Sequence, residues 1–199
     1  MDSDEEMNLS CLTGLFEEAL IYATRLHSRQ RRKWESTPYI SHLLGVASLV
    51  LEDGGDEQEA IAALLHDAVE DQGGLATLEE IRHRFGDRVA SIVEACSDSF
   101  TDPKPPWRQR KEAYVARMRQ AAPEVRRVSL ADKLHNGRAT LATLHREREG
   151  TWARFRGGKE GTLWYYRALA EVFLQDNVDF MALELAKVVQ RMEAEAEKA

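Results

Sequence analysis

The chain has 199 residues, of which 43% are hydrophobic and 31% are charged, and its formal net charge is −7. This length is sufficient for one domain with a substantial core, and the composition is that of an ordinary globular protein. The negative charge argues against nonspecific nucleic-acid binding as the main task. It does not exclude a small anionic substrate, because basic residues can cluster locally.

The cysteines and the first residues bear on cellular location. Cys11 and Cys96 form neither a disulfide framework nor a zinc-type spacing, which fits a reducing cytoplasm. Residues 1–6 are acidic and lack the basic and apolar regions of a signal peptide. No apolar run approaches the length of a membrane span. We therefore expect a cytoplasmic protein.

Helical periodicity recurs along the whole chain and strand-like alternation is nearly absent, so the sequence predicts an all-α fold. We expect a flexible acidic N-terminus over residues 1–12 and a single domain over residues 13–195. The predicted helices cover, in chain order, residues 13–28, 39–52, 57–71, 77–85, 87–97, 107–121, 124–148, 162–175 and 177–194.

Local signals place several of these boundaries. Thr37 and Pro38 resemble an N-cap and the first position of the helix over residues 39–52. Thr77 and Glu80 fit a capping box at the start of the next short helix. Residues 98–106 hold three of the five prolines and are expected to form a loop. Residues 150–161 are interpreted as a glycine-rich and basic connection.

The most informative stretch is LLHDAVED, residues 64–71. His66 and Asp67 are adjacent on an apolar helix and can offer a nitrogen and an oxygen to one metal ion. Because positions i and i+4 share a helix face, we expect His66 to lie below Glu70 and Asp67 below Asp71. Four ionisable groups on one edge of a buried helix are costly unless they bind something. The stretch therefore predicts a metal site.

Two more metal-competent residues lie on apolar segments, His42 at the start of the preceding helix and Asp132 within residues 128–134. With His66 and Asp67 they supply two imidazoles and two carboxylates, a set that suits Mn²⁺, Fe²⁺ or Zn²⁺. A lone histidine is more often a core or capping residue, and Asp132 alone could pair with an arginine. The ordered set is a stronger signal. The remaining histidines are interpreted as surface or structural residues: His27, His83, His135 and His145.

This ordered set resembles the HD phosphohydrolase superfamily, an all-α HD-domain fold. Three segments resemble the hydrolase domain of Rel/Spo-type enzymes in particular: Arg32-Lys33 followed by TPYISH (37–42), ALLHDAVED (63–71) and LADKLHN (130–136). Those enzymes cleave the 3′-pyrophosphate from the alarmones ppGpp and pppGpp. The resemblance covers about residues 13–175, and it implies a stand-alone small hydrolase. One departure is Gly137, where the long enzymes commonly have a larger apolar residue.

The resemblance implies a role for each group of the site. One Mn²⁺, with Fe²⁺ or Zn²⁺ as alternatives, would be held by His42, His66, Asp67 and Asp132. Glu70 and Asp71 would serve the attacking water, one taking its proton and the other orienting it or protonating the leaving group. The alternative for this acidic pair is a solvated helix end, but carboxylates are unfavourable at a helix C-terminus.

Six residues are expected to bind the substrate: Arg32, Lys33, Tyr39, Asn136, Lys159 and Tyr166. Lys159 is nominated for its charge in the glycine-rich connection, because residues 155–166 differ from the long enzymes. Arg32 can stack on a purine and Lys33 can meet phosphate. The alternative for this basic pair is a solvated loop. Asn136 could instead form a cap or an inter-helix hydrogen bond, and Tyr166 could belong to the aromatic core. Further candidates for the phosphates are Arg108, Arg110, Lys111 and Arg156.

The implied reaction is hydrolysis of ppGpp or pppGpp to GDP or GTP and pyrophosphate. A metal-dependent phosphatase acting on another nucleotide, such as NADPH or a nucleoside monophosphate, stays open because HD sites share ligands across such substrates. A non-catalytic nucleotide-binding or antitoxin-type partner is a third alternative, although the intact Glu70 and Asp71 argue against it. We expect neither a membrane nor a nucleic-acid partner. The oligomeric state stays open, a homodimer included.

Overall fold

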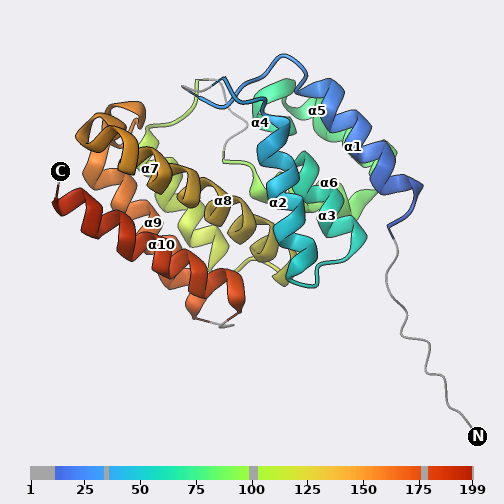
Figure 1. The fold of residues 1–199 in the computed structure, drawn as a ribbon. Coiled ribbons are helices and arrows are strands. Elements are labelled where there is room, and N and C mark those ends of the chain that lie inside the picture. The colour runs from blue at the N-terminus through green and yellow to red at the C-terminus, as the bar shows by residue number, and fades with distance from the viewer. Residues whose placement is uncertain (1–11, 34–35, 99–102, 176–178, 199) are drawn as a thin grey trace, which may run out of the picture.

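The computed structural model describes residues 12–33, 36–98, 103–175 and 179–198, and these form an all-helical arrangement (Figure 1). The helices are α1 (Gly14–Leu26), α2 (Ile40–Glu52), α3 (Glu57–Leu65), α4 (Ala68–Gln72), α5 (Leu75–Phe85), α6 (Asp87–Cys96), α7 (Trp107–Met118), α8 (Pro123–Glu147), the 3₁₀ helix η1 (Arg148–Arg154), α9 (Gly158–Leu174) and α10 (Phe180–Glu197). The predicted all-α fold is confirmed. Of the predicted N-terminal segment 1–12, all but Leu12 lies outside the described residues, as do residues 177 and 178 of the last predicted helix.

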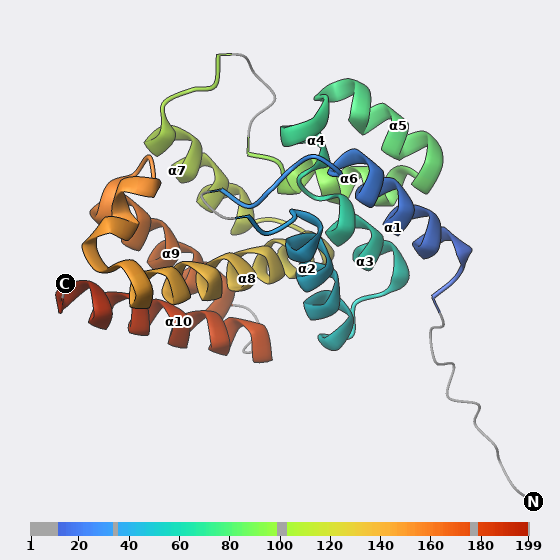
Figure 2. The ribbon, with the colours of Figure 1, turned by 45° about the horizontal axis from the view of Figure 1, so that its top comes forward.

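Helix α8 joins the two halves of the described chain. It packs against α2, α3 and α6 on one side and against α9 and α10 on the other, and Figure 2 shows it crossing between them. Its 25 residues make it the longest of the described helices. A residue in its N-terminal half therefore lies beside both α2 and α3, which is where the metal-competent residues of the sequence gather.

Helix α3 is the most deeply buried element, and residues 59–65 are all buried. Asp56 begins it with a capping box, in which the Asp56 side chain accepts from the Glu59 amide at 2.9 Å and Glu59 accepts from the Asp56 amide at 2.7 Å. The buried Glu59 carboxylate also accepts two hydrogen bonds from Arg127 of α8, at 2.7 and 2.9 Å. This ion pair fixes α8 against α3.

The predicted continuous helix over residues 57–71 is wrong at its centre. Helix α3 ends at Leu65, His66 and Asp67 form a turn, and α4 begins at Ala68. Both residues keep right-handed helical backbone angles, with φ −59° and ψ −29° at His66 and φ −98° and ψ −3° at Asp67. Their side chains still meet, since His66 Nε2 lies 3.0 Å from Asp67 Oδ2.

Two predicted helix caps are also wrong. Helix α2 begins at Ile40 with Tyr39 as its N-cap, because Pro38 forms an isolated bridge with Arg31 before the helix. Helix α5 begins at Leu75, directly after Gly73 and Gly74, so residue 77 lies inside the helix and is no cap. The Thr77 hydroxyl instead donates to the Gln72 carbonyl at 3.2 Å.

Residues 150–161 are more regular than the predicted connection, since they contain most of η1 and the start of α9. Two glycines there accommodate Trp107: a Cβ added at Gly157 or Gly161 would lie 2.6 or 3.0 Å from its ring. Gly137 has a similar role in α8. A Cβ there would lie 3.1 Å from Val188 and 3.3 Å from Tyr166, so the residue is small where α8 meets α9 and α10. None of the helices in the described ranges is long and apolar enough to cross a membrane.

Candidate metal centre

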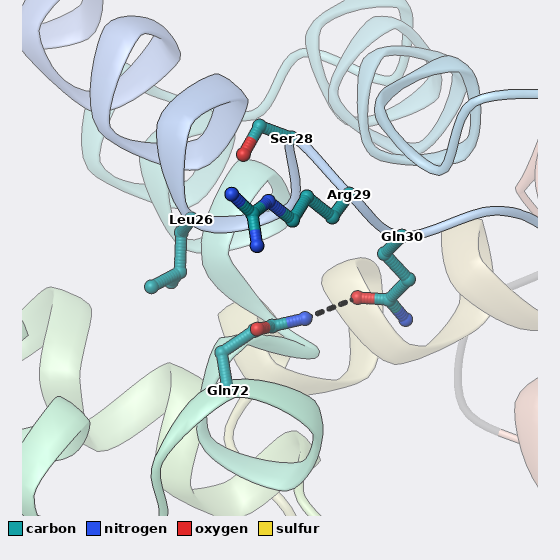
Figure 3. A pocket seen from close by; sticks show the side chains of 5 residues that line it. All are labelled: Leu26, Ser28, Arg29, Gln30 and Gln72. Carbon is teal, nitrogen blue, oxygen red and sulfur yellow. Dashed lines mark hydrogen bonds between the residues drawn. The ribbon is translucent and has the colours of Figure 1, made fainter.

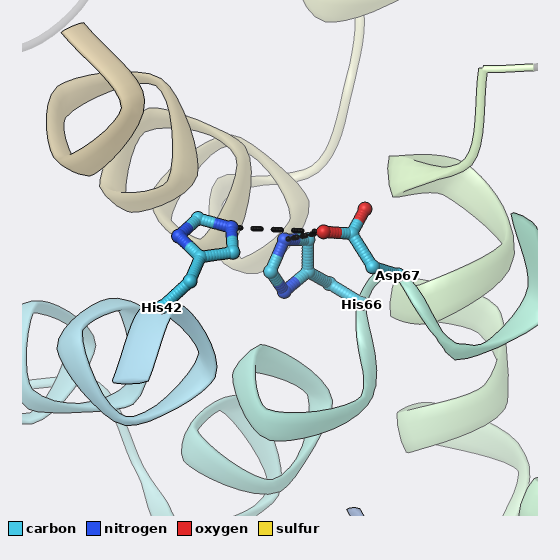
Figure 4. Close-up of side chains that lie close together, drawn as sticks. All are labelled: His42, His66 and Asp67. Carbon is cyan, nitrogen blue, oxygen red and sulfur yellow. Dashed lines mark ion pairs between the residues drawn. The ribbon is translucent and has the colours of Figure 1, made fainter. Parts of the chain in front are cut away.

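Two imidazoles and a carboxylate converge where α2 faces the turn between α3 and α4. Figure 4 shows His42 and His66 pointing at the carboxylate of Asp67. Asp67 Oδ2 lies 3.6 Å from His42 Nε2 and 3.0 Å from His66 Nε2. The three ligand atoms lie within 4.8 Å of one another and could hold one metal ion.

Asp132 of α8 completes this group from the other side. Its Oδ1 atom lies 3.2 Å from His42 Nε2 and 3.5 Å from His66 Nε2. The structure therefore brings together all four residues that the sequence nominates as metal ligands: His42, His66, Asp67 and Asp132.

The donor atoms fit a divalent cation. Both imidazole Nε2 atoms are buried and, among the described residues, have no hydrogen-bond partner. A buried polar nitrogen without a partner is unusual and requires an explanation. Two such atoms that face the same pair of carboxylates would be satisfied together by one cation that accepts nitrogen and oxygen ligands.

The carboxylates are held in the ionised form that binds cations. Burial by itself would raise the pKa of Asp67, but the nearby His66 and His42 hold that pKa well below its usual range. Burial likewise opposes ionisation of Asp132, yet the Lys133 ammonium and the two histidines hold its pKa well below the usual value.

The imidazoles are oriented by contacts of their other ring nitrogens. His66 Nδ1 lies 2.8 Å from the Ala63 carbonyl. A carbonyl can only accept, so Nδ1 of His66 donates to Ala63. Burial alone would lower the pKa of His66, but Asp67 and Asp132 raise it well above its ordinary value, so its Nε2 carries a proton toward the carboxylates unless a cation takes the place of that proton. His42 Nδ1 lies 2.9 Å from His135 Nδ1. Burial, together with His42 and Arg32, lowers the pKa of His135 to about 4, so its ring is neutral near pH 7.

Both carboxylates also accept hydrogen bonds from residues around the centre. Tyr39 donates to Asp67 Oδ2 at 2.5 Å, and its ring stacks on His27 with centroids 5.3 Å apart. Lys133 donates to Asp132 Oδ2, and Asn136 donates to Asp132 Oδ1 at 2.5 Å. These contacts fix where each carboxylate points.

Asp71 lies one turn beyond Asp67, since its amide donates to the Asp67 carbonyl at 3.0 Å. Gln30 donates to Asp71 Oδ2 at 2.7 Å and accepts from Gln72 at 2.5 Å. Figure 3 shows the hydrogen bond between Gln30 and Gln72, two of the residues that line a surface pocket of about 310 Å³. Burial, and secondly the charge of Asp67, raise the pKa of Asp71 above its ordinary value. A carboxylate with a raised pKa is better suited to accept a proton.

Glu70 has a different environment. Its Oε1 accepts from Lys104 at 2.8 Å, and its Oε2 accepts from the Asp98 amide at 3.3 Å. Asp98 is itself paired with Arg110 and with Lys111, whose ammonium lies 3.0 Å from Asp98 Oδ2. Arg110 and Lys111 are thus engaged by a buried carboxylate rather than free for a phosphate.

Comparison with known proteins identifies the fold family. A family model described as an HD domain matches residues 19–163. This chain belongs to the HD-domain family. The match includes all four residues of the metal centre, so the HD-domain protein carries its His/His/Asp group inside the matched region.

Relatives of this HD-domain protein include guanosine-3′,5′-bis(diphosphate) 3′-pyrophosphohydrolases. The protein so named from Xenopus tropicalis, MESH1, is 42% identical over 131 residues, which cover 64% of this chain and 70% of the relative. Its Homo sapiens counterpart is 39% identical over 142 residues, covering 70% of this chain and 74% of the relative. These shares show homology over most of both chains.

Solved structures agree with the sequence relatives. One, described as a metazoan ortholog of SpoT that hydrolyzes ppGpp and plays a role in starvation responses, superposes with a TM-score of 0.74 at 25% identity. The match covers 90% of the HD-domain protein and 96% of that chain. A Listeria monocytogenes EGD-e protein gives a TM-score of 0.68 at 29% identity, over 79% and 99% of the two chains.

Of the residues nominated for substrate binding, some lie beside the metal centre of the HD-domain protein and others do not. Arg32 donates to Asn136 Oδ1 at 2.8 Å, so both lie beside Asp132, and Lys33 is exposed. Lys159 is not brought to the centre. Its ammonium contacts Glu149 at 2.7 Å and the Ala196 carbonyl at 2.6 Å, because the start of α9 lies beside η1 and the end of α10.

The two neighbouring tyrosines of α9 also differ. Tyr166, which the sequence nominates, is buried against Gly137 and hydrogen-bonds with Thr140. The hydroxyl of Tyr165 is buried and finds no hydrogen-bond partner in the described part of the chain. The centroid of its ring lies 4.9 Å from the Lys111 ammonium.

Sequence reasoning missed three residues of this centre. Gln30 holds Asp71, His135 contacts His42, and Lys104 pairs with Glu70. Gln30 and Lys104 lie in segments without periodicity, where the sequence offers no signal for them. His135 did offer one, because it lies three residues after Asp132 and therefore on the same face of α8.

Proposed function

We propose that this HD-domain protein is a metal-dependent hydrolase that removes the 3′-pyrophosphate of ppGpp and pppGpp, producing GDP or GTP and pyrophosphate. The observation that carries the proposal is the pair of buried, unpartnered imidazole nitrogens facing two ionised carboxylates. The choice of ppGpp as the substrate is supported by relatives that are about 40% identical and are named for this activity.

We propose Mn²⁺ as the resident ion, held by His42, His66, Asp67 and Asp132, with Fe²⁺ or Zn²⁺ as the alternatives that the same donor set accepts. When bound, such an ion supplies Lewis-acid stabilisation of phosphate charge and makes a water more acidic. The surrounding residues keep the carboxylates ionised and directed toward the two imidazoles, as binding of a divalent cation requires.

The acidic pair manages the protons of the reaction. Water adds to the phosphorus attached to the ribose 3′-oxygen and the bond to that oxygen breaks. One carboxylate must take a proton from the water, and the departing 3′-oxygen must receive one. Asp71, with its raised pKa and its orientation by Gln30, is suited to accept the proton. Glu70, beside Lys104, lies where an acidic group can orient the water or return the proton.

Arg32, Lys33 and Asn136 are proposed to bind the nucleotide beside the metal centre. Arg32 is partly buried and lies 5.9 Å from the centroid of the Tyr39 ring, so it forms part of the wall next to Asp67. Its guanidinium can stack on guanine while Lys33 meets phosphate. Tyr39 and Tyr166 are proposed to act indirectly. Tyr39 orients the Asp67 carboxylate, and Tyr166 supports the packing of α9 against α8.

Arg32→Ala is expected to raise the KM for ppGpp about 5- to 30-fold and to change kcat less, because a stacked cation contributes on the order of 1–2 kcal/mol of binding. Steady-state kinetics with Mn²⁺ measures both constants. Arg29→Ala, which alters a neighbouring exposed arginine of the same loop, is the matched control. Unchanged ppGpp kinetics in the Arg32 variant would exclude Arg32 from nucleotide binding and leave only its hydrogen bond to Asn136.

The deciding experiment is an ion-exchange assay of the products formed from ppGpp, NADPH and a nucleoside monophosphate, with and without Mn²⁺. The proposal predicts GDP and pyrophosphate from ppGpp, dependent on the ion. Faster release of phosphate from NADPH or the monophosphate would favour a phosphatase acting on another nucleotide. Nucleotide binding without turnover would favour a non-catalytic partner.

The cytoplasm is the proposed compartment. The support is the cysteine content, two residues without a disulfide framework, of which Cys96 is buried and free. Guanosine tetra- and pentaphosphate are the proposed partners of the site, and a homodimer stays among the states to be tested.

A further inference from the structure

The two imidazoles of the metal centre are held by different kinds of partner. His66 Nδ1 faces the Ala63 carbonyl at 2.8 Å, and a carbonyl can only accept a hydrogen bond. His42 Nδ1 instead faces His135 Nδ1 at 2.9 Å. An imidazole nitrogen can either donate or accept, so the orientation of His42 depends on how His135 is held.

His135 is packed closely against α2 at Gly45. A Cβ added at Gly45 would lie 2.4 Å from both Cδ2 and Nε2 of His135, which is closer than such atoms approach. Glycine in the interior of a helix reduces helix stability. The close approach of the His135 ring is a physical reason for a glycine at this position.

The helical spacing of the residues involved makes this contact part of the α2–α8 interface. His42 and Gly45 are three residues apart on α2, and Asp132 and His135 are three apart on α8, so each pair shares a helix face. Asp132 Oδ1 lies 3.2 Å from His42 Nε2, while His135 contacts His42 Nδ1. Helix α8 thus contacts both ring nitrogens of His42.

We propose that His135 is a positioning residue that accepts a hydrogen bond from His42 Nδ1 and thereby directs His42 Nε2 to the divalent cation, with Gly45 providing the space for the His135 ring. The inference rests on the metal centre of the proposed function and is independent of which nucleotide is hydrolysed. When His42 binds a cation through Nε2, its proton must be on Nδ1, and His135 Nδ1 must then be the acceptor.

The test is the affinity for Mn²⁺ of wild-type protein and five variants, measured by titrating metal-free protein with MnCl₂ and following free Mn²⁺ by electron paramagnetic resonance. His135→Leu removes the acceptor and is expected to weaken binding about 10- to 100-fold, the usual effect of losing such a partner. His135→Asn keeps an acceptor near Nδ1 and should stay within a few-fold of wild type. Gly45→Ala displaces the ring and should resemble His135→Leu.

His145→Leu is the matched control, because His145 is an exposed histidine of the same helix, 4.0 Å from Glu195. It should bind Mn²⁺ as wild type does. Thermal unfolding of each metal-free variant separates a loss of affinity from a loss of fold. Combining Gly45→Ala with His135→Leu should weaken binding no further than either change alone, since both act on one contact.

A second readout follows the tautomer of His42 directly. Proton–nitrogen correlation spectra of the Zn²⁺-loaded protein should show a protonated Nδ1 on His42, and the His135→Leu variant should shift that signal. Wild-type Mn²⁺ affinity in His135→Leu and Gly45→Ala would overturn the inference while leaving the proposed function intact. A wild-type protein that binds no Mn²⁺ would overturn both.

Discussion

Asp132→Asn is expected to abolish ppGpp hydrolysis and to weaken Mn²⁺ binding by at least about 100-fold. The magnitude follows because loss of even an outer partner of a metal ligand costs about 10- to 100-fold, and Asp132 is proposed to be a ligand itself. Its Oδ1 lies between the two imidazole nitrogens, 3.2 Å from one and 3.5 Å from the other. The amide oxygen of asparagine has the same shape but lacks the negative charge.

Asparagine is preferred to alanine because its side chain fills the same volume and keeps an oxygen that can accept a hydrogen bond from Lys133 or Asn136. Lys133, whose side chain is only 15% exposed, loses its counter-charge in either variant, and removing one partner of a buried ion pair typically costs about 3–5 kcal/mol of stability. Metal content, Mn²⁺ titration and circular dichroism should be measured together on the asparagine variant.

Asp53→Asn is the matched control for this change. Asp53 accepts from Arg127 at 3.0 Å at the end of α2, eleven residues beyond His42 and therefore roughly 16 Å along the helix. The Asp53→Asn variant loses an ion pair that lies away from the metal centre, so it should bind Mn²⁺ as the wild-type protein does. An Asp132→Asn protein that binds Mn²⁺ and turns over normally would exclude Asp132 from the ligand set.

The second large effect is expected for the acidic pair. Asp71→Asn and Glu70→Gln should each lower kcat for ppGpp by at least about 100-fold, the lower end of general acid–base contributions. Neither residue is in the proposed ligand set, so Mn²⁺ content and nucleotide binding by calorimetry should stay within a few-fold of wild type. The double variant should be less impaired than the product of the two effects if both serve one water.

The structure supplies a control for each member of the pair. Lys104→Met removes the ammonium that lies 2.8 Å from Glu70. If it reproduces the loss seen in Glu70→Gln, the ion pair rather than proton transfer explains the effect. Gln30→Leu removes the donor to Asp71 and should lower kcat by less than Asp71→Asn does. Loss of Mn²⁺ in Glu70→Gln would instead make Glu70 a ligand.

The residues of the candidate metal centre could be nominated from the sequence because each is a polar residue in an apolar helical segment. His42, Asp132 and the His66–Asp67 pair stand among leucine, valine and alanine, and burying such groups is unfavourable unless they are paired or bound to a metal. The same periodicity predicted an all-helical chain. The HD-domain match over residues 19–163 agrees with both.

Helix boundaries were less predictable where a local signal competed with tertiary packing. The helical pattern of residues 57–71 has no glycine or proline at its centre, so nothing in it indicates the turn at His66 and Asp67. Thr77 with Glu80 has the form of a capping box, yet Gly74 precedes the observed helix start. Such patterns describe what a segment prefers by itself, whereas packing against neighbouring helices decides the outcome.

The sequence by itself determined the kind of protein, an all-helical chain with two histidines and two aspartates that are candidates for binding a cation, because such residues are unusual in apolar helical segments. Only the tertiary structure decided how they work together. The packing of α2 and α8 around His66 and Asp67 places His42 and Asp132 beside them, and the α2–α8 contact sets His135 against His42. These arrangements depend on distances between residues as much as 93 positions apart, which local periodicity does not encode.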